Sequence, residues 1–246
     1  MFNTQHILYI VISFLLTALL LVIFDKFVHK ENHKNLILKI SAISTVLIHY
    51  SNIWVDYFKN GGSAQVENNH ILPVYPCNVI MWMLLIAALK KDKGDILFHL
   101  IGEFCLYVGT ICGVVGIVLN VNFDNTPTLM DYDVLKGLLS HSTMLFSCIY
   151  MLSGHFVKIR MFNIISILSG LCMFIVCGVF VNRLYEYFNL EAPDGMFLKS
   201  NPYTNTPPFV FAIIAVIIIA LILLVREMII SKNNLECDEK TNEEIL

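Results

Sequence analysis

The sequence predicts an all-α membrane protein: a polytopic bundle of about seven transmembrane helices, with the N-terminus outside and the C-terminus in the cytoplasm. Of the 246 residues, 57% are hydrophobic and 14% are charged, whereas a soluble domain carries about 25% charged residues. Several apolar runs reach the roughly 20 residues that cross a hydrocarbon core about 30 Å thick. Lys and Arg gather at alternate ends of these runs, which is the positive-inside pattern.

The apolar runs are interpreted as helices in chain order. The first is expected to be a retained span, because no basic residue precedes Ile7 and no small-residue cleavage site follows Phe24. The third begins at Pro76, and proline is favoured in the first turn of a helix. The predicted spans are 7–24, 35–57, 76–89, 96–120, 137–157, 161–188 and 207–230.

The connections between these spans determine the predicted orientation. Segments 25–34, 90–95 and 158–160 are basic, whereas the connections that alternate with them are acidic or nearly neutral. Twelve of the sixteen Lys and Arg residues fall on the proposed inner side, and all seven prolines fall on the outer side. The outer connections are also the longer ones, and long loops often carry functional structure.

The chain is predicted to form one transmembrane domain over residues 1–230, followed by a disordered cytoplasmic tail over residues 231–246. The seven cysteines are odd in number, lie mostly within apolar runs and include no CxxC pair. This distribution is typical of small apolar filler and argues against a disulfide framework or a zinc site. We therefore expect no metal and no cofactor.

Two polar residues are predicted to lie at similar depth below the outer surface. A helix rises about 1.5 Å per residue, which places Cys77 roughly 20 Å, and His141 roughly 21–25 Å, from the inner ends of their spans. The second span adds His49 and Asn52 on one helix face, and Asn182 lies at an outer helix end. Polar groups within membranes usually face a cavity or one another.

Cys77 permits two interpretations on the residues alone. After Pro76 it would meet the unpaired N–H groups and the positive end of the helix dipole, which favour a thiolate, and a neighbouring histidine would complete a Cys–His nucleophile pair. His141 is the first candidate by depth and His49 the second. The alternative is that Cys77 is small apolar filler at a helix end and that the histidine is a packed polar group.

One acidic residue stands apart from the outer polar group. Glu103 lies in the inner half of the fourth span, one turn from His99, and the two are expected to form a structural hydrogen bond. A transporter or channel would need a water-filled path from the outer polar group to this pair. The sequence shows no pair of broken helices and no inverted repeat, which weighs modestly against that function. A non-catalytic membrane protein that binds a lipid or a partner is a further alternative.

Four stretches carry a resemblance to a known family. The stretches YPCNVIMWMLL from Tyr75 and GLLSHSTMLFSCIYML over 137–152 resemble the Pro-Cys helix start and the later His-bearing span of the eukaryotic transmembrane-164 proteins and their bacterial YwaF-like relatives. The stretch LNVNFDNTP over 119–127 and the proline-rich stretch GMFLKSNPYTNTPPF over 195–209 are similar in place to the family's loop and irregular segment.

This resemblance implies a multi-pass lipid acyltransferase of the cell membrane, or a related thioesterase-like hydrolase. Its partners would be a membrane phospholipid or lysophospholipid, with no nucleic acid and no metal. Cys77 would be the nucleophile and His141 its base, with an acyl-thioester intermediate. The supporting or oxyanion-binding residues would be Asn78, Tyr75, His49, Asn52 and Asn182. The chain departs from the family pattern at Tyr75 and Asn78, where relatives carry histidines.

Overall fold

The computed structural model describes residues 2–59, 72–120, 123, 126–188, 194–198 and 208–243. Within these ranges every regular element is a helix, as the sequence predicted. The main helices are α1 (Thr4–Phe27), α2 (Glu31–Lys59), α4 (Pro76–Leu89), α5 (Ile96–Phe104), α6 (Thr110–Val118), α8 (Tyr132–Ser153), α9 (Asn163–Tyr187) and α10 (Pro208–Glu243).

Five of the described helical stretches are long and apolar enough to cross a membrane. They are α1, α2, the continuous stretch Ile96–Val118, α9 and the Ile213–Ile230 part of α10. The apolar helix α4 is shorter, at 14 residues. The 22-residue α8 carries the polar run Ser140 to Thr143 in its middle. Helices thus occupy all seven predicted places, while seven crossings and the orientation of the termini stay predictions.

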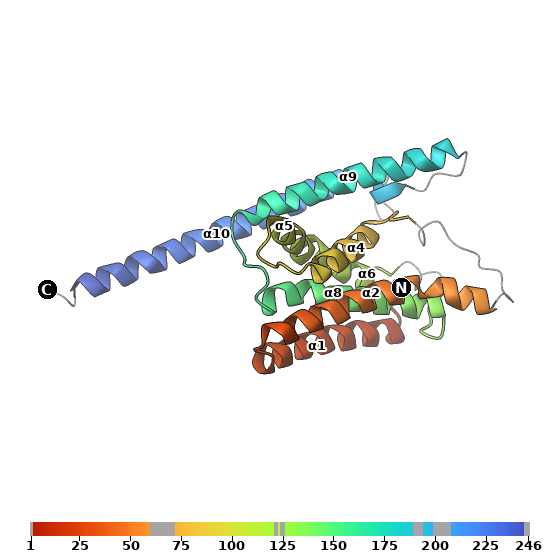
Figure 1. Ribbon diagram of the computed structural model, residues 1–246, viewed down its shortest axis with the longest axis horizontal. Coiled ribbons are helices and arrows are strands. Elements are labelled where there is room, and N and C mark those ends of the chain that lie inside the picture. The colour runs from red at the N-terminus through yellow and green to blue at the C-terminus, as the bar shows by residue number, and fades with distance from the viewer. Residues whose placement is uncertain are drawn as a thin grey trace.

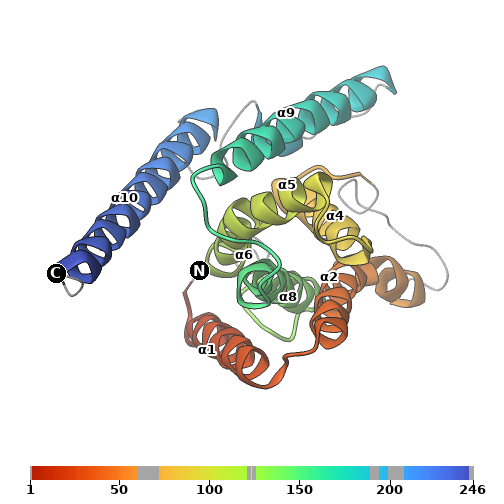
Figure 2. The same ribbon diagram turned by 60° about the vertical axis from the view of Figure 1, so that its left-hand side comes forward.

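Helix α8 forms the centre of the bundle. Figure 2 shows α1, α2, α4, α5 and α6 arranged around it, with α9 lying outside this ring against α5. Twelve of the 22 residues of α8 are buried. On the α2 side, the Thr45 hydroxyl donates to Thr143 at 3.1 Å and the Tyr132 hydroxyl donates to Ser51 at 2.6 Å. The central place of α8 surrounds its polar middle with protein.

Two features of α6 and its neighbour bring the backbones of α6 and α8 close together. A π-helix over Cys105–Gly109 joins α5 to α6, and such bulges are rare and often occur at functional sites. In α6, a Cβ added at Gly113 would lie 2.9 Å from Cβ and 3.1 Å from Cα of Leu145. Any larger residue at Gly113 would therefore push α6 away from α8.

The last described helix, α10, runs from Pro208 to Glu243. The division into one transmembrane domain over residues 1–230 and a tail over residues 231–246 stays a prediction. Figure 1 shows this helix extending well beyond the bundle at its C-terminal end. The fifth span was predicted to start at residue 137, whereas the helix α8 begins at Tyr132. The Asp131 side chain caps this start by accepting hydrogen bonds from the N–H groups of Asp133 and Val134.

Candidate functional site

Cys77 occupies the first turn of α4. The helix begins at Pro76 with Tyr75 at the N-cap position, and the Asn78 and Val79 N–H groups donate to the Tyr75 carbonyl oxygen. The Cys77 side chain is partly buried and packs against the main apolar core. The thiol therefore lies at a helix start, in mainly apolar surroundings.

Asn78 fixes the start of α4. Its side-chain oxygen accepts a hydrogen bond from the Tyr75 N–H at 3.0 Å, and its amide nitrogen donates to Nε2 of His49 at 2.7 Å. Since Nε2 of His49 accepts this bond, the proton of the neutral ring lies on Nδ1. Asn78 thus connects α4 to α2, and both of its polar atoms already have protein partners.

His141 is oriented by its own helix. Its Nδ1 lies 2.7 Å from the carbonyl oxygen of Gly137, which can only accept, so Nδ1 carries the proton and Nε2 carries the lone pair. The ring lies directly on Gly116 of α6, where an added Cβ would overlap Cδ2 and Nε2. The basic nitrogen of His141 is therefore directed at α6, in the middle of the polar part of α8.

Cys77 and His141 belong to helices that both pack on α6. Helices α4 and α8 each contact α6, and the His141 ring lies on Gly116 of that helix. In the described part of the chain no hydrogen bond joins the Cys77 sulfur to the His141 ring. Catalytic hydrogen bonds are often long in free enzymes and tighten when the substrate is bound.

The sequence interpretation missed two residues of this region. Lys136 is buried, with 7% of its surface exposed, and lies in α8 five residues before His141. Tyr50 accepts a hydrogen bond from the ring N–H of Trp82 in α4 at 3.0 Å. The predicted spans left Lys136 in the outer loop that ends before residue 137. Asp131, a residue type that favours the N-cap position, could have indicated that the helix begins earlier and includes Lys136.

The structure places the other predicted residues around the site. The amide of Asn52 donates to Asp133 at 2.5 Å, and the side-chain oxygen of Asn182 accepts from the Gly195 N–H at 2.8 Å. Neither contact is to Cys77. Asn52 therefore fixes the N-terminal end of α8, and Asn182 fixes the segment after α9.

The segment η2 (Gly195–Phe197) lies against the residues that precede Cys77. The Met196 N–H donates to the Val74 carbonyl at 2.7 Å, and the Phe197 ring stacks on Tyr75 with centroids 5.2 Å apart. Met196 and Phe197 both have positive φ, which is uncommon for residues other than glycine. Tyr75 therefore packs this segment beside the start of α4.

Glu103 forms a separate buried group, and the predicted pairing with His99 is wrong. Its carboxylate accepts hydrogen bonds from the Ser166 hydroxyl at 2.5 Å and from Arg160 at 3.3 Å. The side chain of Glu103 is 6% exposed and that of Arg160 is 52% exposed. Glu103 thus connects α5 by hydrogen bonds to the start of α9 and to the loop before it.

Replacing Arg160 with Ala should lower the free energy of unfolding by about 1–3 kcal/mol, because a buried acceptor loses a charged partner. The loss should lie at the lower end of this range, since Arg160 is half exposed and its charge is screened by water. Thermal unfolding of the purified protein in detergent measures the effect. Lys158→Ala, an exposed basic residue of the same loop, is the matched control and should be near neutral.

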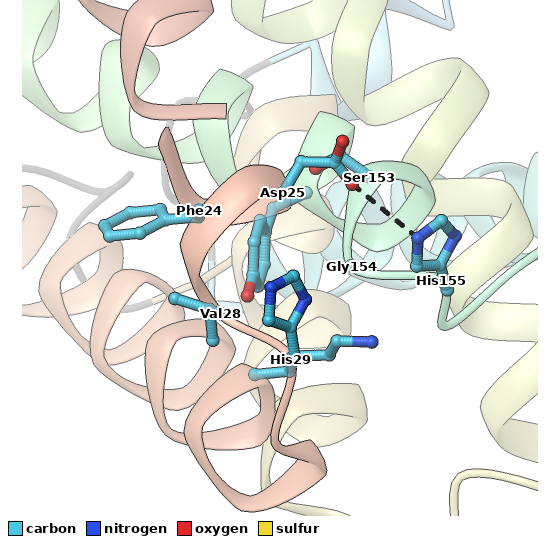
Figure 3. A pocket seen from close by; sticks show the side chains of 9 residues that line it. Phe24, Asp25, Val28, His29, Ser153, Gly154 and His155 are labelled. Carbon is cyan, nitrogen blue, oxygen red and sulfur yellow. Dashed lines mark ion pairs between the residues drawn. The ribbon is translucent and has the colours of Figure 1, made fainter. Parts of the chain in front are cut away.

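A small polar cavity lies at the opposite end of α8 from Asp131. Figure 3 shows it between the α1–α2 connection and the end of α8, with Asp25, His29 and His155 around it. Its volume is about 40 Å³, and the Nε2 of His155 lies 3.6 Å from Asp25. Both groups of this pair are mostly exposed, so it contributes little to stability. The cavity is far too small for a lipid.

The described residues contain no group of three or more His, Cys, Asp or Glu that could hold a metal ion. The six cysteines that the structure describes are free. Of these thiols, Cys105 and Cys148 are fully buried in the core.

Comparison with known proteins identifies the family. A model of the TMEM164 family matches residues 1–227. The chain therefore belongs to the TMEM164 family, and with five helices of membrane-spanning length and composition it is a multi-pass membrane protein. No curated protein and no solved structure matches the chain.

Proposed function

We propose that this member of the TMEM164 family is a membrane lipid acyltransferase that carries the acyl group on Cys77. One observation carries the proposal: α4, which holds Cys77 in its first turn, and α8 both pack on α6, and the lone-pair nitrogen of His141 is directed at that helix. The buried Lys136 lies in α8, five residues before His141. A nucleophile, a base and a cation are thus gathered inside the bundle. Family membership supports the same interpretation.

In the first half-reaction, Nε2 of His141 takes the proton of the Cys77 thiol. The thiolate attacks the ester carbonyl of a phospholipid and forms a tetrahedral intermediate. The carbon–oxygen bond of the ester then breaks, and the lysophospholipid leaves with the proton returned by His141. The product on the protein is an acyl thioester, as in other covalent mechanisms that divide one difficult step into two easier ones.

In the second half-reaction, His141 takes a proton from the hydroxyl of an acceptor lysophospholipid. The resulting oxygen nucleophile attacks the thioester carbonyl, the carbon–sulfur bond breaks, and the proton returns to the sulfur. Water in place of the acceptor would give hydrolysis by the same steps. The same histidine therefore serves as base and acid in turn.

The negative charge that develops in both half-reactions has two sources of stabilisation. The Cys77 N–H lies in the first turn of α4, just before the N–H groups that donate to the Tyr75 carbonyl, and backbone donors of this kind form oxyanion holes. The buried ammonium of Lys136, five residues before His141 in α8, adds a positive charge to this part of the bundle. Asn78 was a candidate donor, but its amide is already bonded to His49, so its role here is to position the start of α4.

A transfer assay in liposomes tests this function. We expect His141→Ala to reduce transfer of a labelled acyl group from phospholipid to lysophospholipid by about 10²–10⁴-fold, the usual contribution of a general base. His155→Ala is the matched control, because His155 is exposed at the other end of α8, and it should transfer at the wild-type rate. Wild-type transfer by His141→Ala would contradict the proposed mechanism.

A further inference from the structure

We infer that a groove between α1, α6 and α8 holds one acyl chain of the lipid substrate, an assignment that rests on the proposed function. The groove has a volume of about 180 Å³. This is room for about six groups of the size of a water molecule, at about 30 Å³ each, and so for a segment of a chain. Its lining residues are Phe14, Thr17, Ala18, Leu21, Thr110, Val114, Leu145 and Ile149.

The lining of the groove is almost wholly apolar. Six of its eight side chains are hydrocarbon or aromatic, and the two threonines each add one methyl and one hydroxyl group. The Thr110 hydroxyl donates to the carbonyl oxygen of Leu106 in the preceding π-helix, so this polar group of the groove already has a hydrogen-bond partner. Such a surface within a membrane protein suits a hydrocarbon chain and gives a polar solute few partners.

The groove begins one helical turn from His141. Leu145 and Ile149 follow His141 by four and eight residues, so all three share one face of α8. Leu145 packs on Gly113 as His141 packs on Gly116, and Gly113 and Gly116 are themselves neighbours on α6. The contacts between α6 and α8 that begin at His141, the proposed base, therefore continue into the groove, about 6–12 Å further along α8.

Hydroxyl groups gather at the His141 end of the groove. The Ser142 hydroxyl lies 3.2 Å from that of Ser13 and 3.0 Å from that of Tyr9. Ser13 precedes Thr17 by one turn of α1, as Ser142 precedes Leu145 by about one turn of α8. The polar groups lie at one end of the groove and the hydrocarbon lining lies beyond them, which matches an ester group with a chain attached.

Two adjacent valines provide a matched test of this assignment. Val114 lines the groove, whereas Val115 is 39% exposed on another face of α6. We expect Val114→Trp to reduce transfer of a hexadecanoyl group by roughly tenfold or more, the scale on which a filled pocket rejects a substrate, and to spare an octanoyl group. Val115→Trp should leave both rates unchanged. Equal effects of Val114→Trp on the two donors would overturn the assignment.

A second measurement separates this assignment from the proposed chemistry. A phospholipid with a photoreactive diazirine in mid-chain is irradiated with the Cys77→Ala protein, and the labelled peptides are mapped by mass spectrometry. The chain site predicts labelling of the groove residues of α1, α6 or α8. This labelling should disappear when Val114→Trp is added and remain when Val115→Trp is added, whether or not the protein transfers acyl groups. Labelling only elsewhere overturns the chain site; if the wild-type protein still transfers acyl groups in the liposome assay, the proposed function stands without it.

Discussion

Cys77→Ala is expected to reduce acyl transfer at least about a thousandfold, to the background rate, because removal of a covalent nucleophile leaves only binding and charge stabilisation. The thiol of Cys112 cannot replace it, since Cys112 lies within α6 and not at the start of a helix. Cys77→Ser should retain a small residual rate, because a hydroxyl is a weaker nucleophile. The liposome assay with a labelled phospholipid measures all three proteins.

The control for this prediction is another cysteine substitution. Cys172 lies exposed on α9, and Cys172→Ser should transfer acyl groups as the wild type does. Unfolding temperatures of the variants establish that the bundle is intact. A Cys77→Ala protein that folds and transfers at the wild-type rate would leave the thiol without a catalytic role.

Gly116→Ala is expected to reduce acyl transfer by about 10²-fold, although the substitution lies outside the reacting groups. The new Cβ would overlap the His141 ring, and Nδ1 of that ring is held by the Gly137 carbonyl, so the ring must move as a whole. A misplacement of about 1 Å in a catalytic group can cost a factor of this size. Steady-state rates with excess donor lipid measure the effect.

The same variant distinguishes displacement of His141 from loss of the fold. Alanine favours a helix over glycine by about 1 kcal/mol, so α6 itself is not weakened, and the unfolding temperature should change little. Gly94→Ala, in the loop before α5, is the control and should leave both activity and stability unchanged. A fully active Gly116→Ala protein would show that the position of the His141 ring does not govern the reaction.

The helices could be predicted from the sequence where apolarity marks them. Pro76 and the apolar run after it gave the bounds of α4 that the structure has, Pro76–Leu89. The start of α8 was missed because its first turn is polar, with Asp133 and Lys136, and only the Asp131 cap marks it. The π-helix at Cys105–Gly109 has no such mark, since its residues are as apolar as the helices on either side.

The site could be predicted only in its outline. Depth along the helices indicated that Cys77 and His141 lie at similar levels, but their contacts depend on how α4 and α8 pack on α6. Gly116 and Lys136 gain their roles from that packing, and neither residue has a distinctive spacing in the sequence. Asn78 was interpreted by its chemistry as an oxyanion donor, whereas its place in the first turn of α4 makes it a cap.

The most direct test of the account is the mass of the peptide that contains Cys77, after the protein is incubated with phospholipid and no acceptor. The proposed mechanism requires one added acyl group on Cys77, which hydroxylamine removes as it removes a thioester and which is transferred when lysophospholipid is supplied. Active transfer without any acyl adduct on Cys77, or with the adduct on another cysteine alone, would contradict it.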